Sequence, residues 1–285
     1  MLVFLFFLIF SPIVFIFLIY LLGILYGQIL GLFFHPKLNR AWNPLFEKLG
    51  EIDIKENGEV YVKNIRNARY NPVFEFENKV TYLNKKYNLN DLEKLWITVN
   101  PYAPLQSHVL LTFQFGGAYQ VKGFLNISYE VRKTDAVNFN ATNALFKPYE
   151  GMYLLSTEED TIYVRTNVRE ATKVYLLPLK TEKEKIQNVF KELSEKINLY
   201  NKNAFMYKPF NRNCLTEIFM PLYDAKIVST KNPFKYLDVL WLLYAQKIVE
   251  GTENSNYTNF KKKHFITDKA KKYPADEFFS FNIRK

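Results

Sequence analysis

The chain has 285 residues, a formal net charge of +10, three histidines and one cysteine. A single cysteine excludes an internal disulfide and, with so few histidines, a cysteine-rich zinc site, so we expect no metal and no cofactor. A basic chain of this kind suits either nucleic acid or anionic lipid headgroups.

The first 34 residues carry no charge, which is typical of a membrane segment. As a helix, Ile13 to Phe34 would span about 33 Å, enough to cross a hydrocarbon core. A cleaved signal peptide is the alternative, but no Lys or Arg precedes Lys37 and good cleavage positions are lacking. We therefore expect residues 1–36 to form an uncleaved membrane anchor, in which Pro12 either kinks the helix or separates a short stub from the span.

The anchor decides how the positive charge is interpreted. Beside a bilayer, we expect lipid headgroups and not nucleic acid as the partner of the basic residues. Lys37 and Arg40 follow the span and nothing basic precedes it, which favours a cytoplasmic domain by the positive-inside rule. Two residues are weak support for that orientation.

Residues 37–250 predict one α+β domain, because short runs of β-branched and aromatic residues are followed by amphipathic helices. A turn and a short helical stretch at Asn90–Leu95 are expected early in the domain. The predicted strands are residues 59–70, Trp96–Val99, Val109–Phe115, Asn126–Arg132, Tyr153–Ser156 and Thr161–Arg165. The predicted helices are Glu182–Leu199, the segment beginning at Cys214, and Tyr236–Val249. Residues 251–285 are rich in Lys and Asn, and we expect a loosely packed basic tail.

Two residues stand out as candidates for chemistry. His35 and His264 are expected at the surface. His108 lies at the start of a strand whose apolar residues predict burial. Cys214 begins a helix, where backbone N–H groups and the helix dipole stabilise a thiolate. A thiolate with a neighbouring imidazole is the constellation used for acyl transfer. The alternatives are a buried hydrophobic cysteine and a structural strand histidine.

Several segments, in order, resemble the periplasmic domain of the Lnb-type lipoprotein N-acyltransferase family, over roughly residues 60–225. They are Ile65–Tyr70, Tyr82–Trp96, Ser107–His108, Ser128–Lys133, Pro148–Tyr153, Glu158–Thr166 and Tyr207–Thr216. The resemblance implies a permuted papain-like fold of the NlpC/P60 type, with an antiparallel sheet and the cysteine-bearing helix packed on it. In that fold the strand histidine precedes the helix cysteine, as it does here.

The resemblance also assigns roles. Cys214 matches the nucleophile and His108 the base. Glu130 would orient the imidazole or, alternatively, form an ion pair with Arg132 or Arg165.

Other positions match the family's motifs less specifically. Asn213 would bind an oxyanion or cap the helix. Ser128 is the next choice for the third catalytic residue. Supporting positions without an assigned role are Tyr207, Glu150, Asp160 and Arg165, and Glu150 or Asp160 is expected to pair with Arg165.

The implied activity moves an acyl group from a phospholipid to the N-terminal amine of an apolipoprotein through a thioester on Cys214. It implies a bacterial inner (cytoplasmic) membrane location with the domain on the periplasmic side. Two features depart from the family: Asn211-Arg212-Asn213 replaces an asparagine pair, and the full transferase has further membrane passes. A cysteine peptidase or amidase acting on cell-wall peptides, and a catalytically silent membrane-tethered binding module, are the alternative functions.

Overall fold

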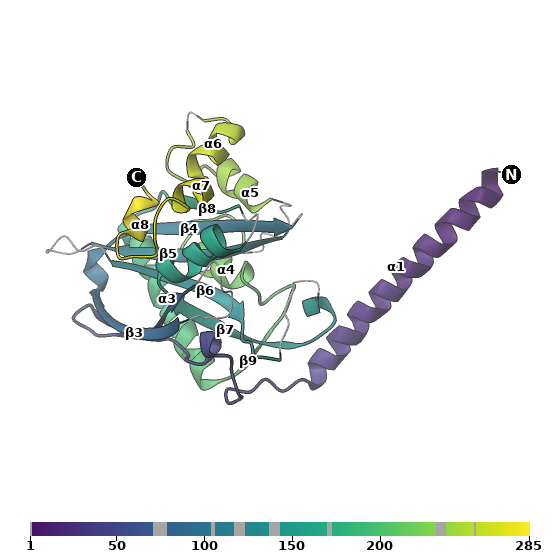
Figure 1. The fold of residues 1–285 in the computed structure, drawn as a ribbon, viewed down its shortest axis with the longest axis horizontal. Coiled ribbons are helices and arrows are strands. Elements are labelled where there is room, and N and C mark those ends of the chain that lie inside the picture. The colour runs from purple at the N-terminus through teal and green to yellow at the C-terminus, as the bar shows by residue number, and fades with distance from the viewer. Residues whose placement is uncertain are drawn as a thin grey trace.

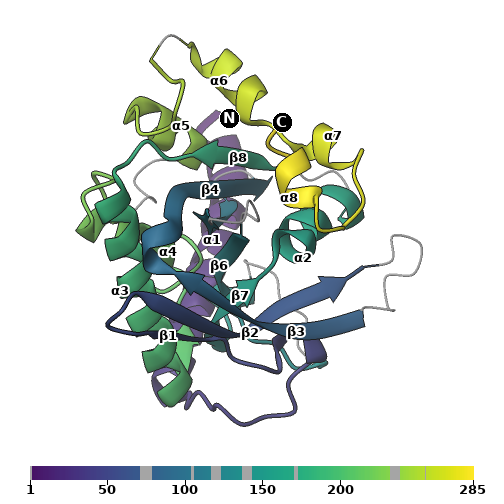
Figure 2. The ribbon, with the colours of Figure 1, turned by 90° about the vertical axis from the view of Figure 1, so that its left-hand side faces the viewer.

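The structure is a computed structural model that describes residues 2–70, 79–103, 106–116, 123–136, 143–169, 173–231, 238–253 and 255–285, with side chains from Val14 onward except Ala103. Figure 1 shows a sheet-centred domain from which one long helix, α1, projects. Figure 2 shows α3 and α4 on one side of the sheet and α2 with α8 on the other.

Helix α1, Leu2–Phe33, is continuous through Pro12, so no separate stub forms. Its stretch Val14–Phe33 has a mean hydropathy of 2.2 and is only 6% buried. Among the residues that the structure describes, this is the one helix long and apolar enough to cross a membrane. The prediction of a continuous apolar helix, mostly uncovered by the rest of the chain, is confirmed.

The sheet has nine strands, in the order β1-β2-β7-β6-β5-β4-β8, with β3 added beside β2 and β9 beside β7. The strands are β1 Glu51–Ile54, β2 Glu59–Arg69, β3 Lys79–Asn88, β4 Leu92–Ala103, β5 Gln106–Phe115, β6 Gly123–Val131, β7 Tyr149–Ser156, β8 Tyr175–Pro178 and β9 Phe205–Tyr207. The β2–β7 pair is parallel and the other named pairs are antiparallel. The sheet is therefore mixed, and the prediction of an antiparallel sheet holds only in part.

The helices cover both faces of this sheet. They are η1 Pro44–Phe46, η2 Leu89–Asp91, η3 Asn143–Leu145, α2 Glu158–Tyr163, η4 Val164–Val168, α3 Lys183–Lys202, α4 Thr216–Asp224, α5 Val239–Ala245, α6 Tyr257–His264, α7 Thr267–Ala270 and α8 Phe279–Asn282. The interior strand β5 is buried on both faces: Phe113 meets Phe190 of α3, while Thr112 donates a hydrogen bond to Glu158 of α2. This double cover explains the nearly uninterrupted apolar run in β5.

Two local predictions were wrong, and a third is tested only in part. Thr161–Arg165 is helical, split between α2 and the π-helix η4, and not a strand. The turn expected before Asn90 is strand β3, and the helical stretch at Asn90–Leu95 is reduced to η2 before β4 begins. Part of the helix predicted at Tyr236–Val249 lies outside the described residues, and the remainder contains α5.

The C-terminal residues are packed, not loose. Phe260, Ile266, Phe279 and Ile283 are all buried. His264, expected at the surface, is buried too, and desolvation lowers its pKa to about 4. His35 is exposed, as predicted.

Candidate active site

The site begins with two neighbouring strands that bring an imidazole to a carboxylate. In the β5–β6 ladder Leu110 lies opposite Ser128, and the same register carried two residues further sets His108 opposite Glu130. Nε2 of His108 lies 3.0 Å from Oε1 of Glu130. The ring N–H does not point squarely at that oxygen, so the contact is an ion pair more than a directed hydrogen bond.

The Glu130 carboxylate has two further partners. Ser128, on the same face of β6, donates its hydroxyl to Oε1 over 3.0 Å. Arg165 of η4 donates through Nη2 over 3.2 Å, and through Nη1 to the carbonyl of Thr161. Glu130 therefore contacts His108 and Arg165 together, so the two roles considered for it coexist.

These contacts hold the pair in its charged form. Burial lowers the pKa of His108, but the Glu130 carboxylate and the nearby Cys214 outweigh burial and Arg165 and raise it to about 9. Burial raises the pKa of Glu130, but His108 and Arg165 outweigh it and bring that pKa well below its usual value. At neutral pH the ring is therefore an imidazolium beside a carboxylate.

Cys214 is the second group near the imidazole. It lies close enough to raise the pKa of His108, and its thiol donates a hydrogen bond to the carbonyl oxygen of Ser107 over 3.8 Å. Because Nε2 faces Glu130, Nδ1 is the ring nitrogen left for the sulfur. Cys214 is 8% exposed and lies two residues before the first residue of α4. The structure thus brings together residues 106 positions apart in the sequence.

Asn213 is a helix cap. Its Oδ1 accepts hydrogen bonds from the backbone N–H groups of Leu215 and Thr216, at 2.8 and 3.1 Å. Its Nδ2 donates to the carbonyl oxygen of Pro209 over 2.6 Å. These bonds stabilise the start of α4, as expected for the capping role.

Two tyrosines lie near enough to the thiol for its charge to act on them. Burial and the nearby Cys214 raise the pKa of Tyr207. Burial and the charge of Cys214 also raise the pKa of Tyr102, whose residue is half exposed. Tyr207 matched a motif position, whereas nothing in the sequence around Tyr102 distinguishes it from the other tyrosines.

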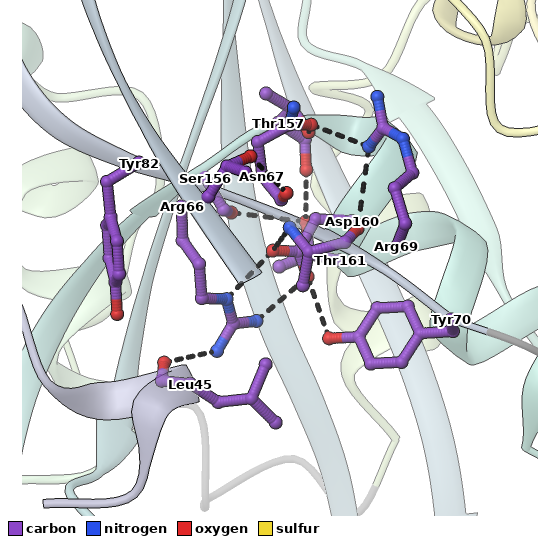
Figure 3. Close-up of polar contacts among 12 residues, drawn as sticks. Leu45, Arg66, Asn67, Arg69, Tyr70, Tyr82, Ser156, Thr157, Asp160 and Thr161 are labelled. Carbon is purple, nitrogen blue, oxygen red and sulfur yellow. Dashed lines mark hydrogen bonds and ion pairs between the residues drawn. The ribbon is translucent and has the colours of Figure 1, made fainter. Parts of the chain in front are cut away.

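Glu150 and Asp160 do not pair with Arg165 in the contacts that define the site. Glu150 binds Arg40, with Oε1 2.5 Å from Nη2. Asp160 accepts both Nε and Nη2 of Arg66, at 2.8 and 2.9 Å, and also the Tyr70 hydroxyl. Figure 3 shows these contacts converging on Asp160 from β2 and the chain that follows it.

The Asp160 cluster is connected to the site through Arg66. Arg66 lies on β2, opposite Ser156 at the point where β2 runs parallel to β7. Its positive charge is one of the groups that lower the pKa of Glu130. Arg132, the other cation considered for Glu130, instead donates to the carbonyl oxygens of Leu38, Phe46 and Glu47. Arg132 therefore ties the segment that follows the anchor to β6.

The arrangement is suited to nucleophilic chemistry. A cysteine near the start of a helix, an imidazole and a fixed carboxylate are the types of group that nucleophilic cysteine chemistry requires. In the part of the chain that the structure describes, no three His, Cys, Asp or Glu side chains gather as a metal site.

A protein-family model, the Lnb N-terminal periplasmic domain, matches residues 78–240. The match covers more than half of the 285 residues and includes His108, Glu130 and Cys214. Of the seven segments that carried the resemblance, only Ile65–Tyr70 lies outside it. No curated protein and no solved structure matches the chain.

The family description and the apolar helix together fit a membrane-anchored protein with a periplasmic domain, against the weak charge signal of Lys37 and Arg40. From the family match, we conclude that the chain belongs to the Lnb N-terminal periplasmic domain family.

Proposed function

We propose that this protein is a cysteine-dependent acyltransferase, anchored in the bacterial inner membrane with its domain in the periplasm. It would transfer an acyl group from a phospholipid to the N-terminal amine of an apolipoprotein. The observation that carries the proposal is that His108 is paired with the Glu130 carboxylate and lies near the Cys214 thiol.

The first half-reaction forms a thioester. The Cys214 thiolate attacks the carbonyl carbon of a phospholipid ester, and the tetrahedral intermediate expels the lysophospholipid alkoxide. The His108 imidazolium gives its proton to that alkoxide, which leaves a neutral ring and an acyl group on sulfur. A pKa of about 9 keeps this proton available at neutral pH.

The second half-reaction restores the resting pair. The neutral amine of the acceptor attacks the thioester carbonyl, His108 accepts the amine proton, and the Cys214 thiolate leaves. One amide forms as one thioester breaks, and no proton is gained or lost over the cycle. Glu130 keeps Nε2 engaged throughout, so that Nδ1 faces the sulfur.

Lipid as donor is supported by the surroundings of the thiol. Tyr102 and Tyr207 lie near Cys214 and add aromatic side chains to the site. Phe210 precedes it on a tight turn closed by Lys208 and Arg212 and is more than half exposed. The anchor keeps this apolar surface within reach of a bilayer.

The order of the site residues supports the permuted papain-like fold of the NlpC/P60 type. The histidine comes first, on β5, the orienting acid follows on β6, and the cysteine comes last, ahead of α4. In addition, α4 packs its Ile218 and Phe219 into the main core beside the sheet.

The test is mass spectrometry of lipoprotein N-termini from cells depleted of their own N-acyltransferase. The full-length chain should restore N-acylation, whereas Cys214→Ser and His108→Ala, expressed to the same level, should not. In parallel, labelled phospholipid should leave a hydroxylamine-sensitive acyl group on the chain. Free fatty acid or cleaved cell-wall peptide with unchanged N-termini would identify a hydrolase. A Cys214→Ser variant with full activity would refute the thiol chemistry altogether.

A further inference from the structure

The anchor helix has one face that differs from the rest. Gly23, Gly27 and Gly31 recur every four residues and so share one side of α1. Gly27 is buried, whereas Leu25 and Tyr26 next to it are 56% and 63% exposed. Something covers the glycine face, while the apolar side chains on the other faces stay open.

The cover is a short turn of the domain, residues 143–146, which contains η3. A Cβ on Gly27 would lie 2.6 Å from Cα of Phe146 and 2.7 Å from the carbonyl oxygen of Leu145. The Phe146 ring also meets Tyr20 edge to face, with centroids 5.2 Å apart. Only glycine at position 27 allows backbone to approach backbone this closely.

We propose that residues 143–146 are a membrane-penetrating turn, whose partner is the acyl-chain region of the bilayer that α1 crosses. Tyr20, Gly23 and Gly27 lie inside the membrane-span candidate Val14–Phe33. They lie about 9 to 20 Å along the helix from Phe33, and a tilt of about 20° changes that depth by less than about a tenth. Whatever packs on them shares that depth.

The open face of α1 argues that this part of the helix is in lipid and not in water. Leu22, Leu25, Leu32 and Phe33 are 56% to 79% exposed on the same stretch that the turn contacts. Apolar side chains in such a contiguous band are strongly disfavoured in water and favoured in hydrocarbon.

The hydrogen bonds and side chains of the turn are compatible with a position inside the membrane. Non-helical backbone at membrane depth must find its hydrogen bonds within the protein. The N–H groups of Phe146 and Lys147 both donate to the carbonyl of Asn143. Nε2 of Gln28, the one side-chain amide in the uncharged segment, lies 3.5 Å from the carbonyl oxygen of Leu145. The remaining side chains, Ala144, Leu145 and Phe146, are apolar.

The turn also leads toward the site. Ala144 is buried with Val131 and Tyr149 in a small cluster against which Tyr207 packs, and Tyr207 is the tyrosine beside Cys214. A bilayer around Phe146 would therefore bring acyl chains to the side of the domain that holds the thiol. The placement of the turn does not depend on acyl transfer, so it survives if the proposed reaction fails.

Nitroxide labelling tests the depth directly. Cys214 is the only cysteine, so Cys214→Ser in the full-length chain gives a background for single labels at Leu145→Cys, Leu25→Cys and Glu56→Cys. Leu25 is the lipid reference on α1, and exposed Glu56 is the aqueous reference. The chains are reconstituted in vesicles of phosphatidylethanolamine and phosphatidylglycerol, and collisions with oxygen and with a water-soluble nickel chelate are measured.

The label at position 145 should collide with oxygen more often than with the nickel chelate, as the label at position 25 does. In the Gly27→Ala variant the label at position 145 should no longer collide preferentially with oxygen, because the added Cβ displaces the turn. Gly31→Ala should leave this preference unchanged, because a Cβ there meets only the flexible Met206 side chain, at 3.3 Å. The label at position 25 should stay in lipid in both variants, which shows that the helix still inserts. A label at 145 as open to nickel as position 56 would overturn the proposal. So would equal behaviour of the two glycine variants.

Discussion

Nε2 of His108 lies 3.0 Å from Oε1 of Glu130, an ion pair between adjacent strands with most of both side chains shielded from solvent. The pair is held in place by Ser128 and Arg165, which bind the same carboxylate oxygen. Because one ring nitrogen is committed to this pair, Nδ1 is the nitrogen left for the nearby thiol. The electrostatics of the pair make its behaviour with pH predictable.

The first prediction concerns stability against pH. The folded pKa of His108 is about 9, above its ordinary 6.5, so its contribution is complete below about 6.5 and lost as pH rises through about 9. Glu130 has a lowered pKa, so its contribution is present above 4.5 and lost as pH falls through the folded value. Unfolding free energy should therefore decline between about pH 6.5 and pH 9. Denaturant titrations of the wild type and Glu130→Gln should show a weaker slope in the variant. Identical slopes would mean that Glu130 does not hold the imidazolium.

The second prediction tests whether Cys214 acts as a nucleophile or is only a buried residue of the core. Cys214→Ser is nearly isosteric, but a hydroxyl has no accessible anion at neutral pH. It should abolish the trapped acyl-thioester while moving the unfolding midpoint little. The reverse result, a less stable protein that still acylates, is what a merely buried cysteine predicts.

The third prediction ranks the residues around the ring. His108→Ala should lower the acylation rate by about 10² to 10⁴, since general acid–base catalysis supplies about that factor. Glu130→Gln should cost less, because packing still orients the ring. Ser128→Ala removes one hydrogen bond worth about 1 kcal/mol, so a loss of about fivefold is expected. Single-turnover rates of thioester formation measure all three. A silent Glu130→Gln beside an inactive Ser128→Ala would transfer the orienting role to Ser128.

The fourth prediction compares two acid-to-amide changes. Asp160→Asn leaves Arg66 with a weakened partner where both side chains are almost fully buried, and breaking such a pair costs about 3–5 kcal/mol. Glu150→Gln weakens a pair whose Arg40 is one-third exposed, and should cost less than about 1 kcal/mol. Chemical unfolding of the full chain in the same detergent gives both values. Equal costs would show that the buried Arg66–Asp160 pair, drawn in Figure 3, stabilises the fold no more than the partly exposed Arg40–Glu150 pair.

Much of the sheet could be predicted, because β2, β5, β6 and β7 carry dense β-branched or aromatic residues. Thr161–Arg165 has the same composition but is buried helix, and the tertiary environment overrides propensity there. A signal for the helix was present: Glu158, Glu159 and Asp160 form an acidic first turn. Strand β3 was missed because its exposed Lys and Asn residues dilute the alternation.

Part of the candidate site could also be predicted from the sequence, and part could not. His108 and Cys214 were proposed as a pair from residue type and local position, and the resemblance assigned their roles and added Glu130. The partners of Arg66, Arg132 and Glu150 could not be predicted, because they join segments 85 to 110 residues apart through side-chain contacts. Charged side chains offer many equivalent pairings until the fold selects one.

The last prediction concerns the C-terminal residues, which were expected to be loose. Arg284 donates to both carboxylate oxygens of Glu158, at 2.6 and 2.7 Å, and Glu158 is fully buried. The same carboxylate accepts a hydrogen bond from the Thr112 hydroxyl of β5, so Glu158 links the residues that follow α8 to the sheet. Arg284→Met keeps much of the apolar stem over Trp96 and Phe124 but leaves a buried carboxylate without its cation.

We expect Arg284→Met to cost about 3–5 kcal/mol of unfolding free energy near pH 7. Lys285→Met is the matched control, since that exposed lysine donates only to Asn282, and it should cost less than about 0.5 kcal/mol. The double variant Arg284→Met with Glu158→Gln should recover part of the loss, because it removes the unpaired charge. Chemical unfolding monitored by tryptophan fluorescence reports on this region through Trp96. An Arg284→Met chain as stable as the Lys285→Met control would show that the C-terminal residues are not fastened to the sheet by this pair.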